Sequence, residues 1–258
     1  MVNKMNQWLV DIIEEIQTSN DLSDIKRVLI KTREYLGFNN ISYVVKCPET
    51  FTRSTTIFVG DYPSEWIERY SKQGYVNIDP VALHCFTSQV PYHWKRINKH
   101  TEDVVHNFFG EAEEFKLYDG ISVGTPHFDG KIDLISLASD KIIDEDSAQQ
   151  QHAIINLNAL QPFIHERTSK LLQESQHSTV NIQLTEREKT CLVWVAEGKT
   201  AQDIAAILSI SESTVVFHLK NSIQKLNVTN RSQAIAKAVL LGLISPQFPR
   251  NSVPTYHF

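Results

Sequence analysis

The spacing of hydrophobic and polar positions changes along the chain, and each change predicts a different element of secondary structure. Apolar residues three or four positions apart indicate helices, alternating apolar residues indicate strands, and Gly, Pro and polar runs separate them. Over the first two thirds of the chain the pattern predicts helices at 3–18, 22–36, 63–73, 102–117 and 144–172, and strands at 40–46, 55–59, 121–127 and 132–138. This order is typical of an α+β fold, an α/β/α sandwich around an antiparallel sheet.

The last quarter of the chain, residues 184–244, has the pattern of an all-α domain of four helices. Thr185 can cap a first helix that Gly198 ends, and Thr200 can cap a short second helix. A tight turn at 209–211 leads into a third helix, and Asn230 can cap a fourth. Caps, turn and helical spacing agree with one another, and together they predict a DNA-binding helix-turn-helix.

The third helix of this domain has two distinct faces when residues are placed about 100° apart. One face carries the residues expected to pack against the first two helices: Val215, Leu219, Ser222 and Leu226. The other face carries the residues expected to read DNA: Val216, Phe217, Lys220 and Gln224. In a major groove Lys220 can reach a guanine edge or a phosphate, and Val216 or Phe217 can contact a thymine methyl group. The alternative is a small helical bundle with a few exposed apolar side chains.

Charge is distributed unevenly along the 258 residues, whose net charge is −5. Residues 183–258 hold 8 Lys+Arg against 5 Asp+Glu, or +3, whereas residues 1–182 hold 17 against 25, or −8. The basic part suits double-stranded DNA as a partner, and because +3 is modest, a homodimer would hold its site better. The predicted organisation is one domain at 1–170, a linker at 171–182, a second domain at 183–244 and a tail at 245–258.

Neither the cysteines nor the histidines show a spacing that indicates a disulfide framework, a metal site or a cofactor. Cys47, Cys85 and Cys191 are far apart, and the ten histidines form no H-x-H or HExxH motif. No apolar segment is long enough to span a bilayer, so we expect a cytoplasmic protein with no membrane partner. We also expect no cofactor, no metal and no catalytic residue.

One motif resembles that of an enzyme: residues 120–124 read G-I-S-V-G and fit the G-x-S-x-G nucleophile elbow of α/β-hydrolases. That elbow needs a strand before the serine and a helix after it. Here the pattern predicts the reverse, a helix that ends at Gly120 and a strand that follows it. A tight helix-to-strand turn is therefore the preferred interpretation, and the chain is not expected to be an enzyme.

A further informative segment, DYPSEWIERYSKQGYVNIDP, combines aromatic and acidic residues. Trp66 and Tyr70 are four residues apart and share a helix face. Asp79 precedes a proline, which favours an extended backbone and lets the carboxylate turn inward. Together with Trp94 these groups can bind a small amide or ester. Trp donates a hydrogen bond, Tyr can donate and accept one, and ionised Asp accepts. The alternative is that the aromatic residues only form part of the core.

The C-terminal motifs resemble the LuxR-type helix-turn-helix. The matching segments, which run from 184 to 236, are LTEREK, W-x-A-x-GKT, IA-x-IL, ISE-x-TV-x-x-HL, KLN and NR-x-x-A-I-A. The resemblance implies base contacts by Val216 and Lys220, which share the reading face with Phe217. It also implies phosphate contacts by a set of polar and basic residues: Lys199, Thr200, Thr214, Lys225 and Arg231.

The N-terminal spacing W-x3-Y-x8-DP-x13-W, followed by a glycine, resembles the autoinducer-binding domain of the same family. The resemblance implies that an N-acyl homoserine lactone binds here, with Trp66 donating to the lactone carbonyl and Tyr70 to the acyl carbonyl. Asp79 would accept the hydrogen bond of the ligand amide, and Trp94 would pack over the lactone ring. Ser136 matches a hydroxyl position that helps to hold the acyl carbonyl, and Tyr62 matches an aromatic position in the pocket wall.

We therefore expect a ligand-responsive transcriptional regulator of quorum sensing that acts as a homodimer. Its expected partners are a small-molecule autoinducer, a dyad-symmetric operator in double-stranded DNA and a second copy of the chain, with RNA polymerase a further candidate. One alternative is a LuxR-type solo regulator that acts without ligand or responds to a different small molecule. A response regulator shares the DNA-binding module, but its receiver domain needs alternating β/α units that residues 1–170 do not show.

Overall fold

The computed structural model describes residues 2–94, 103–127, 130–144, 147–175 and 182–245, and the chain divides into two compact units. One unit is built mainly from residues before 176 and the other mainly from residues after 181. The N-terminal part contains, in chain order, α1 (Val2–Thr18), α2 (Leu22–Leu36), β1 (Asn40–Thr50), β2 (Arg53–Gly60), α3 (Ser64–Gln73), the 3-10 helix η1 (Tyr75–Asn77), α4 (Pro80–Cys85), β3 (Tyr92–His93), α5 (Asp103–Glu114), β4 (Asp119–Pro126), β5 (Ile132–Ser139) and α6 (Ala148–Ser175). The C-terminal part contains α7 (Glu186–Ala196), α8 (Ala201–Leu208), α9 (Glu212–Lys225) and α10 (Arg231–Leu240).

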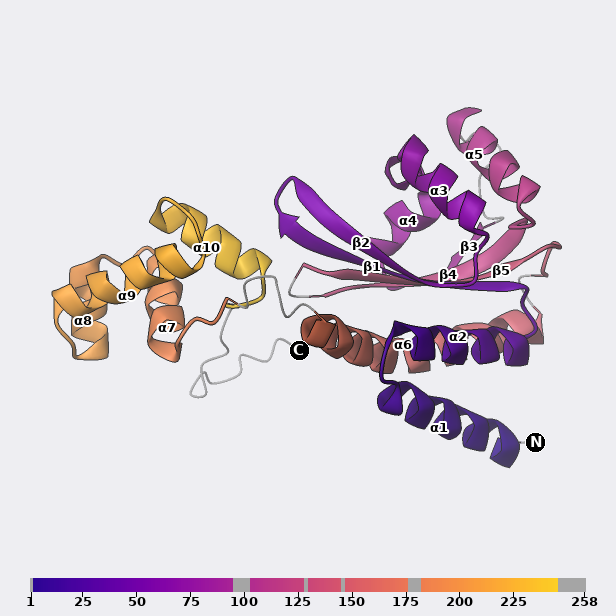
Figure 1. Cartoon of the computed structure of the whole chain (residues 1–258), viewed down its shortest axis with the longest axis horizontal. Helices are drawn as coiled ribbons and strands as arrows, with labels where there is room; N and C mark the ends of the chain where they lie inside the picture. The colour runs from indigo at the N-terminus through magenta and orange to yellow at the C-terminus, as the bar shows by residue number, and fades with distance from the viewer. Residues whose placement is uncertain (1, 95–102, 128–129, 145–146, 176–181, 246–258) are drawn as a thin grey trace, which may run out of the picture. The chain divides into compact units, whose positions relative to one another are not determined.

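The strands of the N-terminal unit form one sheet in the order β2-β1-β5-β4-β3. β5 pairs with β1 and β4, and β4 pairs with β3, all antiparallel. The register places Ser42 of β1 and Ser122 of β4 on either side of Ser136 of β5. α2 and α6 cover one face of the sheet with α1 packed outside them, and α3, α4 and α5 lie over the other face (Figure 1). This arrangement confirms the predicted α/β/α sandwich around an antiparallel sheet.

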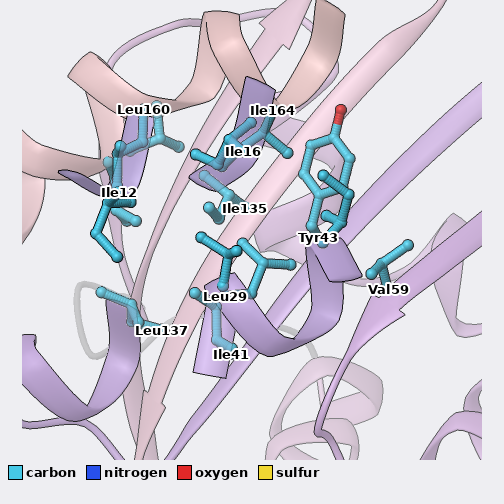
Figure 2. Close-up of a cluster of buried hydrophobic side chains, with 14 of the residues drawn as sticks. Ile12, Ile16, Leu29, Ile41, Tyr43, Val59, Ile135, Leu137, Leu160 and Ile164 are labelled. Carbon is cyan, nitrogen blue, oxygen red and sulfur yellow. The ribbon is translucent and has the colours of Figure 1, made fainter. Parts of the chain in front are cut away.

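The face of the sheet that α1, α2 and α6 cover holds the larger apolar core (Figure 2). Side chains alternate along β5, so Ile135 and Leu137 point into this core while Leu134 and Ser136 point to the opposite face. Leu29 of α2 belongs to the same buried cluster as Ile135 and Leu137. Full burial of each such side chain contributes about 1.5–3 kcal/mol, so the alternation alone strongly selects the register of β5.

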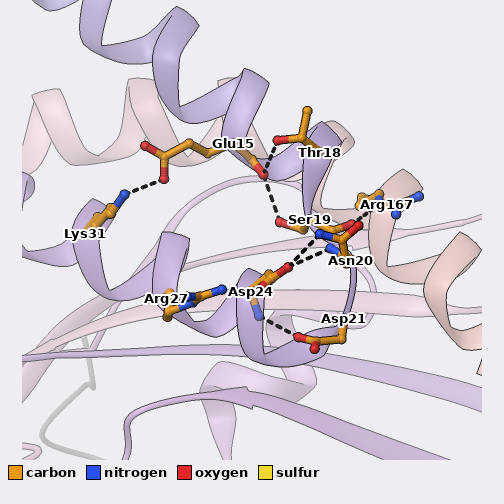
Figure 3. Close-up of polar contacts among 9 residues, drawn as sticks. All are labelled: Glu15, Thr18, Ser19, Asn20, Asp21, Asp24, Arg27, Lys31 and Arg167. Atoms are coloured by element: carbon orange, nitrogen blue, oxygen red, sulfur yellow. Dashed lines mark hydrogen bonds and ion pairs between the residues drawn. The ribbon is translucent and has the colours of Figure 1, made fainter.

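Polar contacts hold the three covering helices together where α1 turns into α2 (Figure 3). Asp21 caps α2 by accepting a hydrogen bond from the Asp24 amide at 2.8 Å. The Asp24 carboxylate in turn accepts from the backbone of Asn20 at 2.7 Å. Arg167 of α6 donates to the carbonyl of Ser19 at 2.7 Å, which attaches the long C-terminal helix of this unit to the same turn.

The C-terminal unit has the four helices and the helix starts that the sequence predicts. Thr185 forms a capping box with Glu188 at the start of α7, and Thr200 forms one with Asp203 at the start of α8. Asn230 caps α10 by accepting from the Gln233 amide. The core of the unit is formed by buried residues from all four helices: Cys191, Leu192, Ile204, Val215, Leu219, Leu226, Ala234 and Ala238. The predicted four-helix helix-turn-helix domain is confirmed.

The boundary between α5 and β4 differs from the predicted one. α5 ends at Glu114 rather than at 117, because the chain turns through Lys116 with a φ of 63°. β4 begins one residue before Gly120, so this glycine lies inside a strand and the prediction that it ends a helix is wrong. A Cβ at Gly120 would lie 2.4 Å from the Leu137 carbonyl oxygen and 2.8 Å from the Trp94 ring, so glycine here permits a close approach rather than a helix end.

Two short elements, α4 and β3, lie in stretches for which the sequence predicts no element. α4 has 6 residues, too few to show a helical period, and it begins at the Asp79 cap. β1 extends beyond the predicted strand to Thr50, and α6 runs from Ala148 to Ser175, so it includes 171–175 of the predicted linker. Residue 102, residues 176–181 of the linker and residues 246–258 of the tail lie outside the described residues. Across the described ranges, no helix is long and apolar enough to cross a membrane.

Candidate ligand pocket and nucleic-acid interface

A cavity of about 340 Å³ lies on the face of the sheet that α3, α4 and α5 cover. Its volume falls in the range of about 300–1,000 Å³ that is usual for small-molecule sites. Its wall is mostly aromatic and aliphatic, and it brings together all of the ligand-binding residues that the sequence predicts: Tyr62, Trp66, Tyr70, Asp79, Trp94 and Ser136. The residues come from separate elements, so it is the tertiary fold that makes them neighbours.

Asp79 is the buried acid of this cavity, with only 8% of its surface exposed. It caps α4, and its Oδ1 accepts a hydrogen bond from the Val81 amide at 2.8 Å. Its Oδ2 accepts from the hydroxyl of Tyr70 at 2.9 Å. Burial raises the pKa of Asp79 to about 6, although these hydrogen bonds act in the opposite direction. At neutral pH the group is therefore mainly a carboxylate, an acceptor that faces an apolar cavity.

Tyr70 is oriented by Asp79. Burial, and after it the charge of Asp79, raises the pKa of the Tyr70 phenol, so the hydroxyl keeps its proton. In this structure that proton is directed to Asp79, and the predicted donation from Tyr70 to a ligand carbonyl would need the O–H bond to rotate. The ring also lies edge-on to Trp66, at 6.0 Å between centroids, and both rings line the cavity.

Trp94 is positioned by the sheet beneath it. Its indole N–H donates to the hydroxyl of Ser122 at 2.9 Å, and that hydroxyl lies 2.6 Å from the hydroxyl of Ser136. The close approach to Gly120 places the indole directly against β4. The indole N–H of Trp94 is therefore bonded to the protein, while the residue lines the cavity; its packing over a lactone ring stays a prediction.

Ser122 has a supporting role that the sequence analysis missed. It is fully buried inside β4, and the chain continues as a strand on both sides of it. The strand-then-helix geometry of a nucleophile elbow is therefore absent at this described position. This role follows from the pairing of Ser122 with Ser136 in the sheet. Because strand register is not visible in one sequence, no sequence signal identifies it.

Tyr62 has a buried hydroxyl that makes no hydrogen bond to any described residue. Burial raises the pKa of this phenol, so it stays protonated, and the hydroxyls of Ser42 and Ser136 are its polar neighbours. An unpaired buried polar group is costly, and a ligand carbonyl or hydroxyl would satisfy it. The sequence does not predict most of the apolar wall, which comes from the strands and from α5: Val44, Phe58, Ile132, Leu134, Phe108, Phe109, Ala112 and Leu117.

The second candidate surface is the outer face of α9 in the C-terminal unit. Val216 and Phe217 are 42% and 59% exposed, and Lys220 is exposed beside them. On the opposite face Val215 and Leu219 are buried, as the helical spacing predicts. The structure therefore separates a packing face from an outward face that contains the three residues predicted to read bases.

The residues predicted to contact phosphates are in different situations. Lys199 and Arg231 are exposed near the starts of α8 and α10. Thr200 uses its hydroxyl in the capping box of α8, and the hydroxyl of Thr214 lies 2.7 Å from that of Ser211. All four residues lie at helix starts, where backbone amides favour phosphate, but the hydroxyls of Thr200 and Thr214 already make contacts within the domain.

Lys225 makes a contact within the domain instead. Its Nζ lies 2.8 Å from Oε2 of Glu188, a carboxylate with 3% of its side chain exposed. Burial acts to raise the pKa of Glu188, but Lys225 and the Thr185 amide outweigh it and the net direction is down. The contact shows that Lys225 helps to hold α7 and α9 together, and its phosphate contact stays a prediction.

Comparison with known proteins places both units in one family. Residues 21–168 match the autoinducer binding domain family, and residues 182–238 match the bacterial regulatory proteins of the luxR family. The transcriptional activator protein AnoR of Acinetobacter nosocomialis is 34% identical over 241 residues, which is 93% of this chain and 100% of AnoR. The transcriptional activator protein LuxR of Aliivibrio fischeri strain ES114 is 33% identical over 242 residues, covering 93% of this chain and 96% of LuxR.

Solved structures show the same arrangement of elements. SdiA in complex with octanoyl-rac-glycerol has a TM-score of 0.75 and 25% identity, covering 92% of this chain and 95% of that one. Escherichia coli SdiA in a second crystal form has a TM-score of 0.74 and 26% identity, covering 93% of this chain and 99% of that one. The chain belongs to the LuxR family of bacterial transcriptional regulators, with an autoinducer-binding domain followed by a LuxR-type helix-turn-helix.

Proposed function

We propose that this regulator binds an N-acyl homoserine lactone in the cavity of its N-terminal unit. The observation that carries the proposal is the hydrogen-bonded pair of Asp79 and Tyr70, the acid buried within a mostly aromatic and aliphatic cavity. Such a ligand has one amide N–H, which suits the carboxylate of Asp79 as acceptor. It also has two carbonyl oxygens, which suit the donors of Trp66 and Tyr70.

The remaining lining residues fit the rest of the same ligand. The unpaired hydroxyl of Tyr62 and the hydroxyl of Ser136 lie on the cavity wall, where they can serve the acyl carbonyl. Apolar side chains such as Val44, Phe58 and Leu134 offer a surface to the acyl chain. Trp94 presents a ring against which a lactone can pack.

We further infer that two copies bind a dyad-symmetric operator and activate transcription. Val216, Phe217 and Lys220 form the outward face of α9, the third helix of the helix-turn-helix, which enters the major groove in this fold. Two copies would present these helices about 34 Å apart, one turn of DNA. The charge of +3 on residues 183–258 favours such pairing, since one copy neutralises few phosphates. AnoR and LuxR, the relatives compared above, are both named transcriptional activators.

Thermal melting of the full chain tests the ligand. Acyl homoserine lactones of short and long chain should raise the melting temperature, because a ligand at 100 times its Kd stabilises the folded state by about 2.7 kcal/mol. The Asp79→Asn variant should fold but respond much less, since an amide oxygen is a weaker acceptor than a carboxylate. Wild-type protein that melts at the same temperature with every lactone tested would contradict the ligand assignment.

A second ligand class has one observation in its favour. The SdiA structure described above contains octanoyl-rac-glycerol, an ester without an amide N–H. Such a ligand would have to offer a glycerol hydroxyl to Asp79. Octanoylglycerol in the same melting experiment distinguishes the two classes: stabilisation by the glyceride alone favours it over the lactone. A gel shift with ligand-free protein tests the solo regulator, which would bind its operator at full affinity without either compound.

A further inference from the structure

A second cluster of chemically active side chains lies on the opposite face of the sheet from the cavity. Asp133 belongs to β5, between Ile132 and Leu134, which both line the cavity, so strand alternation directs Asp133 to the face that α6 covers. His165 belongs to α6, and His127 follows directly after the end of β4. His165 is more than thirty positions from the other two residues, which explains why no metal-binding spacing is visible in the sequence.

The three side chains meet at one point. Oδ2 of Asp133 lies 3.1 Å from Nε2 of His127 and 2.7 Å from Nδ1 of His165. One potential ligand atom from each residue lies within 4.8 Å of those of the other two. The Asp133 side chain is 0% exposed, whereas those of the two histidines are 17% and 19% exposed. The cluster is thus closed on the side of the core and accessible on the side of the histidines.

Both contacts of Asp133 join an imidazole nitrogen to the carboxylate at ion-pair distance. Within the described part of the chain, neither contact has the N–H alignment of a well-formed hydrogen bond. Two imidazole nitrogens and a carboxylate that converge in this way can share a cation in place of protons.

We propose that His127, Asp133 and His165 form a binding site for a divalent transition metal of the zinc class. Two imidazole nitrogens and one carboxylate are a set that suits Zn²⁺, and three protein ligands leave a coordination position open. Ligand atoms around a tetrahedral zinc lie about 3.4 Å apart, as bond lengths near 2.1 Å require. The contacts of 3.1 and 2.7 Å are shorter, so the side chains have to move slightly apart to admit the ion. The cation would also neutralise a carboxylate that is wholly withdrawn from water.

Metal binding would require the imidazole rings of His127 and His165 to change their orientation. Their centroids are 3.6 Å apart and their planes differ by 13°. A metal must lie near the plane of each ring it binds, so the two rings have to turn out of this parallel stack on binding. Both are partly exposed, which leaves them room to rotate. Metal binding should therefore fix the hairpin between β4 and β5 against α6.

Two hydroxyls support the site from the core side. The hydroxyl oxygens of Tyr43 of β1 and Thr168 of α6 are both buried, and the two groups are neighbours. The charge of Asp133 acts on the Tyr43 phenol, so the two groups are neighbours. Figure 2 shows the Tyr43 ring within the apolar cluster and its hydroxyl at the edge of that cluster. Hydroxyls in such positions can orient a ligating carboxylate.

Titration with Co²⁺ tests the site, because cobalt replaces zinc and absorbs visible light when protein nitrogen and oxygen atoms bind it. Full-length protein without a histidine tag is treated with a chelator and titrated with Co²⁺, and then Zn²⁺ is added as competitor. We expect a saturable visible band with one equivalent of Co²⁺, which Zn²⁺ removes. The His127→Gln, His165→Gln double variant should bind at least about 100-fold more weakly.

The matched control is His106→Gln, which removes an exposed histidine from α5 of the same unit and should leave the band unchanged. The single His127→Gln variant serves if the double variant does not fold, since His127 lies outside the regular strand. The thermal stability of the wild type should also rise with Zn²⁺ and return to its former value with chelator. Absence of a saturable band, or a band of equal strength in the ligand variants, would overturn the proposal.

Discussion

Tyr70 and Asp79 are nine residues apart in sequence and share a hydrogen bond of 2.9 Å inside the ligand cavity. The pair joins α3 to the start of α4, and it keeps a charged acceptor next to a protonated donor. Its cost is the burial of a carboxylate, which shows as a pKa raised to about 6. Because of this raised pKa, the stability of the folded chain should depend on pH, which can be measured without any ligand.

Asp79→Asn should change how stability depends on pH. The pKa of Asp79 rises from 3.8 to about 6 on burial, so between these pH values the folded chain binds more protons than the unfolded chain. Wild-type stability should therefore fall relative to the variant as pH rises from 4 to 6, by up to about 3 kcal/mol, and change little above that. Urea unfolding of ligand-free protein at several pH values measures this, and equal pH profiles for both proteins would contradict it.

Ser122→Ala should weaken the ligand pocket without touching a catalytic group. The substitution removes the acceptor of the buried Trp94 N–H, and an unpaired buried donor costs about 1–3 kcal/mol. We expect a lower melting temperature and a weaker ligand response, because the indole loses its anchor. Ser139→Ala, in the neighbouring strand β5, is the control and should leave the ligand response intact. A hydrolytic activity lost on Ser122→Ala would instead support the nucleophile-elbow interpretation.

Two glycines should respond to alanine in opposite directions. Gly120→Ala would place a Cβ 2.4 Å from the Leu137 carbonyl oxygen and against the Trp94 ring, so β4, β5 or the indole must move. We expect the free energy of unfolding to fall by about 2 kcal/mol or more. We also expect the response to ligand to be lost. Gly110→Ala lies inside α5, where a Cβ meets nothing within 4 Å, and should stabilise the helix by about 0.5–1 kcal/mol. Denaturant unfolding of the two variants compares them directly.

Lys225→Ala should destabilise the DNA-binding unit. It leaves the Glu188 carboxylate, which is 3% exposed, with the Thr185 amide but without Lys225, and since Lys225 is itself 39% exposed we expect a loss of stability of about 1–3 kcal/mol. Because the pKa of Glu188 is lowered in the folded state, the stability it contributes should be present above pH 4.5 and lost as pH falls below it. Lys220→Ala removes the same charge from an exposed position and should change stability by less than about 0.5 kcal/mol. Equal effects of the two substitutions on unfolding would show that the ion pair contributes little.

Lys220→Ala should act on DNA binding rather than on folding. If Lys220 contacts a phosphate, the slope of log affinity against log salt falls by about 0.9 for each copy bound. If it contacts a guanine edge, the loss of about 1–3 kcal/mol should appear for the operator and not for unrelated DNA. Gel shifts at several salt concentrations, with operator and scrambled sequence, separate these results. Unchanged affinity for both DNAs at every salt concentration would exclude α9 as the reading helix.

Local chemistry made the helix-turn-helix predictable from the sequence. Thr185, Thr200 and Asn230 cap helices because each side chain satisfies amides only three residues away. The two faces of α9 follow from helical spacing alone, since Val215 is buried and Val216 exposed as the period requires. The pairing of Trp66 with Tyr70 on one helix face is equally local. These features depend on neighbours within one turn, and a single sequence contains them.

The tertiary structure alone determined how distant residues combine. Strand register brought Ser122 beside Ser136 and gave Trp94 its acceptor, and close packing showed that Gly120 permits an approach rather than ending a helix. Lys225 is predicted to contact a phosphate, and only the tertiary structure shows that it also pairs with Glu188 of α7. His127, Asp133 and His165 meet only once the sheet is covered by α6. Each of these contacts crosses elements, so its free energy depends on an arrangement that spacing along one chain does not specify.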